Sequence, residues 1–492
     1  MSEEQSSYRQ IMKATSLFGG VQVFQIIVQI IKSKIIAVLL GPIGMGIVGL
    51  LTSSLGLISG LTNFGLGTSA VKYIAEANGI ANETRIATIT IVLRRLIWLT
   101  GALGTIITLM LSPWLSQLTF GNKDYTLTFV WISITLLFNQ LTSGEMVLLQ
   151  GMRKLQYLAK ANLYGSVLGL IITVPLYYKL GIQGIVPVII VTSLVSFLLS
   201  RYFSRKISIK HIRVTQVRTI AESKNMLTMG FMISLTGLIT LGASYIVRIF
   251  INRAGSIADV GLYNAGFAII NTYVGLIFTA MATDYYPRLS KVAHNDDHSK
   301  LTINQQSEIA LLILSPILIV FLVFINWVVV LLYSTKFIAV NGMIYWAALG
   351  MFFKAASWAI AFVFLAKGAS KLFFWSELIA NIYLLGLNLL GYYLWGLTGL
   401  GLSFLIGYLL YLVQVYIIAN MKYKFTYGKG FKKIFSFQLT LAVCCFLSDN
   451  FSHQPYPYII GVVLIIISGW YSFRELDKRL EIISIFRNYR NK

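Results

Sequence analysis

The sequence predicts an all-α, polytopic membrane protein of about fourteen transmembrane helices. The first observation is composition: 57% of the residues are hydrophobic, 12% are charged, and the mean hydropathy is +0.75. An ordinary soluble domain carries about 25% charged residues, so this chain lacks the charge for a water-facing surface. The second is a series of apolar runs, each long enough to cross about 30 Å of hydrocarbon. The third is that most basic residues lie between these runs.

The apolar runs locate the individual spans. They cover residues 17–40, 43–64, 96–118, 126–150, 157–180, 182–203, 226–251, 260–283, 309–333, 340–366, 373–396, 398–419, 434–448 and 456–473. The first run has no small-residue cleavage site and is too long for a signal-peptide core, so we expect it to remain as a span. The thirteenth run is the shortest, because Asp449 interrupts it.

The basic residues predict the orientation. The formal net charge is +23, which in a soluble protein would suggest nucleic-acid binding. Here, with the amino end inside, the outer turns hold only Lys123, Lys179, Arg253 and Lys336, and most of the 40 basic residues lie in inner segments. This asymmetry predicts a multi-pass protein of the bacterial inner membrane with both termini in the cytoplasm. It also predicts contact with anionic membrane lipids and no nucleic-acid partner.

The longest basic inner loop, from Arg201 to Lys224, separates six spans from the next six. We therefore predict two six-helix lobes around a central cavity, followed by two further helices. The predicted domains are an N-lobe at 1–203, a cytoplasmic linker at 204–225, a C-lobe at 226–420, and the last helices with a basic tail at 421–492.

A weak internal repeat agrees with two lobes. Lys34 precedes Gly41 by seven residues, and Arg248 precedes Gly255 by the same seven. In each case a short glycine-containing segment leads into the next helix. Many secondary transporters are built from such repeats, with the substrate site between the halves.

Four basic residues inside the spans are candidates for a site, because a charge near the bilayer centre costs roughly 2.5–3.5 kcal/mol and usually faces a cavity or a partner. Lys354 is near the middle of its span, which favours a cavity over an interhelical ion pair. Lys34 and Arg248 are nearer the outer ends of their helices, and snorkelling to the interface is the alternative for both. Lys32 and Lys34 point to nearly opposite faces, so we expect at most one of them on the same cavity. The repeat favours Lys34.

Two acidic residues also lie inside the spans. Glu145 is about a turn and a half from the inner surface, where it either pairs with Lys154 or Lys160 or exchanges protons. Glu377 is nearer still to the cytoplasmic boundary, and it is the second candidate for ion coupling or for partnering a cation.

Enzyme motifs are absent from the sequence. We find no phosphate-binding glycine-lysine loop, no nucleophile elbow, and no ligand spacing among the four histidines. Cys444 and Cys445 are adjacent and suit neither a metal site nor a disulfide framework. The outer turns are too short for a catalytic loop. The sequence therefore predicts no catalytic residues, no metal and no cofactor.

Several motifs resemble a known family. These are Leu-Phe-Gly-Gly at 17–20, the run Lys-Ser-Lys-Ile-Ile-Ala-Val-Leu-Leu-Gly-Pro-Ile-Gly-Met-Gly at 32–46, the segment at 63–76, and Tyr-Pro-Arg-Leu-Ser at 286–290. They resemble the Wzx-type O-antigen translocases, lipopolysaccharide flippases of the multidrug/oligosaccharidyl-lipid/polysaccharide exporter (MOP) superfamily. Family members often have twelve spans, so the last two helices are a departure.

The resemblance implies alternating access of two lobes that carry an oligosaccharide on undecaprenyl diphosphate to the outer leaflet. It also implies a polysaccharide polymerase and a chain-length regulator as partners. A diphosphate needs fixed cations in a low-dielectric cavity, whereas an exporter of cationic drugs would need buried acids. We therefore assign the diphosphate to Lys34, Arg248 and Lys354, with Lys32 as a further candidate. The alternatives are a lipid II flippase of the same superfamily and a non-enzymatic membrane scaffold.

Overall fold

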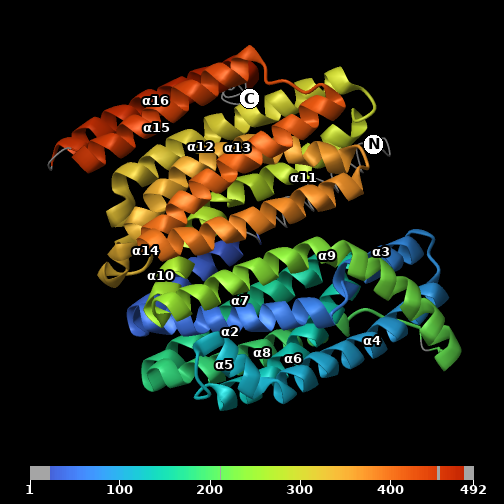
Figure 1. The fold of residues 1–492 in the computed structure, drawn as a ribbon. Helices are drawn as coiled ribbons and strands as arrows, with labels where there is room; N and C mark the ends of the chain where they lie inside the picture. The colour runs from blue at the N-terminus through green and yellow to red at the C-terminus, as the bar shows by residue number, and fades with distance from the viewer. Residues whose placement is uncertain (1–20, 22, 211, 452–454, 481–492) are drawn as a thin grey trace, which may run out of the picture. The chain divides into compact units, whose positions relative to one another are not determined.

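The computed structural model describes residues 21, 23–210, 212–451 and 455–480 (Figure 1). Within these residues the chain forms helices joined by short turns, without a β-strand. The predicted all-α class of a polytopic membrane protein is confirmed. Positions 17–20 and 22 of the first predicted span, and the end of the basic tail from 481, lie outside the described residues.

The chain divides into two compact units, and the first extends to Gly261. It begins with a helix at residues 23–39, which precedes the first labelled helix. The elements that follow are α2 (Gly41–Thr62), α3 (Leu66–Gly79), α4 (Glu83–Met110), α5 (Ser112–Phe120), α6 (Thr126–Gly151), α7 (Leu155–Leu180), η1 (Gly181–Gly184), α8 (Ile185–Ser204), α9 (Gln216–Ala254) and the first turns of α10 (Ile257–Phe267).

The second unit begins at Leu262, inside α10. Its elements are η2, a π-helical segment (Ala268–Val274), α11 (Leu276–Lys291), α12 (Asp296–Leu332), η3 (Thr335–Val340), α13 (Asn341–Ala366), α14 (Ser370–Tyr423), α15 (Lys429–Phe451) and α16 (Tyr456–Leu480). The last two helices pack on α12 as well as on each other.

Ten stretches of the described chain are long and apolar enough to cross a membrane, and two of them are helical hairpins. The 50-residue stretch contains α7 and α8, which pack together on either side of η1. The 54-residue α14 turns back at Gly396, where φ is +58°. Its two arms lie so close that a Cβ at Gly399 would be 1.9 Å from the carbonyl oxygen of Gly391. The helix at 23–39 and α9 occupy the first and seventh predicted spans.

The third predicted span, 96–118, differs from the structure. The helix α4 begins earlier, at Glu83, and ends at Met110, and a separate short helix α5 follows. Pro113 stands in the first turn of α5, where its missing N–H is tolerated. A continuous helix would have lost a hydrogen bond at that residue, so the chain breaks there.

The helix α9 packs within the first unit. It packs on α2 and α3 and so belongs to the first unit, whereas the predicted C-lobe begins at residue 226. Glycine makes this packing close: a Cβ at Gly230 of α9 would be 2.3 Å from the carbonyl oxygen of Phe64. The first compact unit therefore includes α9 and ends after it, at Gly261.

The two glycine segments of the internal repeat pack against each other. A Cβ at Gly46 of α2 would be 1.9 Å from the carbonyl oxygen of Ile257, and a Cβ at Gly261 of α10 would be 1.9 Å from that of Pro42. Near its start, each of the two helices α2 and α10 therefore has a glycine that packs on the backbone of the other helix. The repeat seen in the sequence corresponds to a helix crossing that only residues without a Cβ allow.

Candidate functional site

The second unit contains a cavity of about 250 Å³ between α13 and the two arms of α14. Its wall is largely aromatic and aliphatic, with Lys354, Glu377 and Asn381 as its charged and amide side chains. Lys354 and Glu377 are both site residues predicted from the sequence, and they line one cavity in the structure. A cavity of this kind, apolar with a few convergent polar groups, is the usual form of a small-molecule site.

Lys354 projects from α13 and has no carboxylate within ion-pair distance among the described residues. Its Nζ donates a hydrogen bond of 2.6 Å to Oδ1 of Asn271. The same nitrogen lies 5.0 Å from the ring centroid of Tyr408 and 5.6 Å from that of Phe404, both on α14. Cation–π contacts stabilise the ammonium without neutralising its charge. Lys354 therefore keeps its charge on a wall that it shares with Glu377.

Asn271 is the partner that sequence analysis missed. It lies in η2, and π-helical segments inside α-helical stretches are frequent at functional sites. While its Oδ1 accepts from Lys354, its Nδ2 is buried and has no hydrogen-bond partner in the described part of the chain. A buried donor without a partner calls for a ligand, an ion or a water. The ammonium and the amide donor each suit an anion, and of these two residues Lys354 is the one that lines the cavity.

Glu377 lies on the first arm of α14 and accepts a hydrogen bond from the hydroxyl of Tyr411 on the second arm. This bond also holds the hairpin together. Lys354 and Glu377 both line the cavity, but they form no ion pair with each other.

The first unit contains a larger cavity of about 730 Å³, lined by the helix at 23–39 together with α2, α6, α7 and α8. Its lining is rich in amide and hydroxyl side chains, and Lys32 is its one charged residue. Lys34 is not among the residues that line it. The internal repeat favoured Lys34 over Lys32 as a cavity residue, whereas this cavity is lined by Lys32. Arg248, on α9, donates to the carbonyl oxygen of Ser244 one turn earlier, at 2.9 Å.

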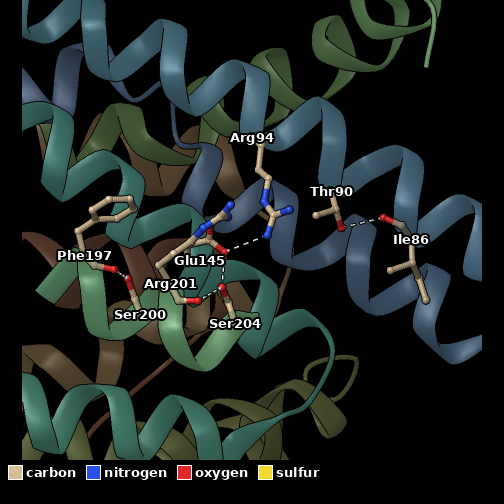
Figure 2. Close-up of polar contacts among 8 residues, drawn as sticks. All are labelled: Ile86, Thr90, Arg94, Glu145, Phe197, Ser200, Arg201 and Ser204. Atoms are coloured by element: carbon tan, nitrogen blue, oxygen red, sulfur yellow. Dashed lines mark hydrogen bonds and ion pairs between the residues drawn. The ribbon is translucent and has the colours of Figure 1, made fainter. Parts of the chain in front are cut away.

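A buried charge cluster joins three helices of the first unit (Figure 2). Glu145 of α6 is only 6% exposed, and its carboxylate accepts from Arg201 of α8 and, at 3.3 Å, from Arg94 of α4. Ser204 donates to the same carboxylate at 2.5 Å. The predicted partners, Lys154 and Lys160, were wrong. The carboxylate faces α4 and α8, so it cannot reach the helix that follows it in sequence.

This cluster predicts a stability effect. Replacing Glu145 with Gln removes the only acid between two arginines, which are 39% and 31% exposed at their side chains. Breaking a fully buried pair costs about 3–5 kcal/mol, and partial exposure of the arginines reduces this to about 1–3 kcal/mol. We expect a lower thermal midpoint in detergent. Glu76→Gln, which breaks an exposed pair with Lys72, is the control, expected within about 0.5 kcal/mol. Equal shifts for both variants would contradict this account.

Other polar residues on the cavities escaped sequence analysis. Four amides of the first-unit cavity, Gln25, Gln29, Asn139 and Asn162, lie inside predicted spans. They carry no charge, so the pattern of charged residues within the spans does not mark them. The presence of several side-chain amides within apolar runs is the sequence pattern that could have predicted this cavity.

The fold defines a class of membrane transporters. The structure is similar to the lipid II flippase MurJ in its inward closed conformation, with a TM-score of 0.68 and 14% identity over 94% of this chain and 99% of that one. It is also similar to an inward-facing multidrug resistance transporter of the MATE family and MOP superfamily, with a TM-score of 0.65, 15% identity, and 83% and 96% of the chains covered. The chain thus has the fold of MOP superfamily transporters.

Within that class, the chain belongs to the family of polysaccharide biosynthesis proteins, whose model matches residues 11–293. The lipid III flippase of Escherichia coli strain K12 is 20% identical over 365 residues, which are 71% of this chain and 83% of that protein. The lipid III flippase of Shigella flexneri matches to the same extent. These relatives are named as flippases, which supports at a coarse level the prediction of a transport protein without catalysis.

Proposed function

We propose that this chain is a flippase that moves an oligosaccharide, linked to undecaprenyl diphosphate, from the cytoplasmic to the outer leaflet of the bacterial inner membrane. The observation that carries the proposal is the ammonium of Lys354 on the wall of a largely apolar cavity, with a hydrogen bond to Asn271 and no carboxylate within ion-pair distance in the described part of the chain. A diphosphate in the cavity offers oxygens to this ammonium, which Asn271 holds in place. Charge-assisted hydrogen bonds are about twice as strong as neutral ones, and a low dielectric strengthens them further.

The remaining sequence candidates complete the proposal. Lys34, Arg248 and Lys32 attract the diphosphate as the two lobes alternate around a central cavity. Glu145 and Glu377 partner these cations or exchange protons during the cycle. Both termini lie in the cytoplasm, and a polysaccharide polymerase with a chain-length regulator receives the product. Family membership in polysaccharide biosynthesis supports an O-antigen-like repeat unit as the cargo.

Lipid II, the cell-wall precursor, is the second candidate cargo. The specific observation in its favour is the similarity to the lipid II flippase MurJ over 94% of this chain. Both cargoes share the diphosphate, so the Lys354 cavity suits either. The distinction lies in the headgroup beyond the phosphates.

Depletion of the chain from the cell that makes it tests the proposal. We expect loss of the surface polysaccharide while the cells continue to grow, because a polysaccharide repeat is not needed for wall integrity. Lysis on depletion would instead assign the chain to lipid II. Unchanged polysaccharide and unchanged growth would overturn both assignments.

A further inference from the structure

The first-unit cavity differs in chemistry from the cavity around Lys354. Its wall carries four side-chain amides and six hydroxyls, and none of its lining residues is aromatic. Lys32 is its only ionisable residue. The volume, about 730 Å³, falls in the range of about 300–1,000 Å³ typical of small-molecule sites. A cavity so polar within a membrane bundle must hold water or a polar ligand, because lipid satisfies none of these groups.

The four amides form no side-chain hydrogen bond within the described part of the chain. They come from two faces: Gln25 and Gln29 lie one turn apart on the helix at 23–39, whereas Asn139 and Asn162 project from α6 and α7. Each amide offers two donors and an acceptor. Amides that served only to join helices would bond to a neighbour, as Gln140 does when it donates to Thr100 at 2.9 Å.

Unlike the amides, hydroxyls of the cavity form hydrogen bonds within their own helices. Thr142, Ser166, Thr192 and Ser196 each donate to the carbonyl oxygen four residues earlier on their own helix, at 2.6–2.9 Å. Their protons are therefore occupied, and their oxygens can only accept from the cavity. The wall thus combines acceptors from hydroxyls with donors and acceptors from amides.

We propose that this first-unit cavity binds the sugar rings of the cargo. Sugar hydroxyls both donate and accept, which matches a wall of mixed amides and hydroxyl oxygens. A cationic drug would find no carboxylate among the lining residues, and an acyl chain would leave the amides unsatisfied. This inference rests on the proposed function, and it adds a sugar site separate from the Lys354 cavity.

Binding measurements on the full chain in nanodiscs test the inference. The probes are undecaprenyl diphosphate alone, and undecaprenyl diphosphate carrying the oligosaccharide that accumulates in the depleted host. The key variant combines Asn139→Leu with Asn162→Leu, and the matched control is Gln150→Leu, an exposed amide of α6 outside the cavity. We expect the double variant to weaken binding of the glycosylated lipid about tenfold and to leave that of the bare lipid unchanged. The control should bind both lipids like the parent chain.

Thr142→Val combined with Thr192→Val gives a second variant of nearly unchanged shape, in case the leucine variant fails to fold. This variant should weaken binding of the glycosylated lipid about threefold. If the cavity variants weaken the binding of both lipids equally, or of neither lipid, the sugar site is overturned and the proposed function stays in place. Lys354→Ala separates the sugar site from the proposed function, because this variant should weaken the binding of both lipids. If that variant binds both lipids at full strength, the proposed function fails.

Discussion

Replacing Lys354 with Ala is expected to abolish surface polysaccharide while the protein accumulates normally. The substitution removes the one ammonium of the second-unit cavity, and it leaves Oδ1 of Asn271 without its donor. Each charge-assisted hydrogen bond to a phosphate oxygen contributes about 1.5–3 kcal/mol, so the rate should fall at least tenfold. The measurement is the amount of surface polysaccharide relative to the amount of protein in the membrane.

Two variants make this result specific. Lys354→Arg keeps the charge and should retain part of the activity, although the guanidinium is larger than the ammonium. Lys336→Ala removes an exposed lysine of η3 and should leave the polysaccharide unchanged. Full activity of Lys354→Ala would remove this residue from the site.

Replacing Gly46 with Ala is expected to destabilise the protein by about 2–3 kcal/mol. The new Cβ would stand 1.9 Å from the carbonyl oxygen of Ile257 and 2.9 Å from its carbonyl carbon. Because backbone atoms cannot rotate away as a side chain can, α2 and α10 must separate at their starts. The measurement is the thermal midpoint of the purified protein in detergent.

Gly56 provides the matched control on the same helix. A Cβ at Gly56 meets no atom within 4 Å, so Gly56→Ala should be neutral or stabilising by about 0.5–1 kcal/mol. The reciprocal variant Gly261→Ala, which meets the carbonyl oxygen of Pro42, should behave like Gly46→Ala. Equal midpoints for Gly46→Ala and Gly56→Ala would contradict the close helix crossing.

Much of the fold could be predicted from the sequence because lipid imposes a simple rule. A helix must be apolar over about 20 residues to span the hydrocarbon, so the runs themselves mark the helices. The break at Pro113 and the packing of α9 could not be predicted in the same way. They depend on helix ends and on backbone contacts, such as that of Gly230 with Phe64, which leave no mark on average hydropathy.

The candidate site was predicted in part for a similar reason. Lys354 and Glu377 were found because a charge in an apolar run is conspicuous. Asn271 and the four amides were missed because neutral polar residues in spans are common. The partners of Glu145 were missed because Arg94 and Arg201 lie 51 and 56 residues away in the chain, and only the packing of α4 and α8 on α6 brings them together.

The most direct test is translocation by the purified chain in proteoliposomes. Undecaprenyl diphosphate carrying the host oligosaccharide is placed in one leaflet, and an impermeant reagent that modifies the sugar reports its arrival in the other. We predict transfer that requires the protein and falls at least tenfold with Lys354→Ala. Absence of transfer by the parent chain, or transfer by Lys354→Ala at the parental rate, would contradict the claim that the cavity around Lys354 conducts a lipid-linked diphosphate.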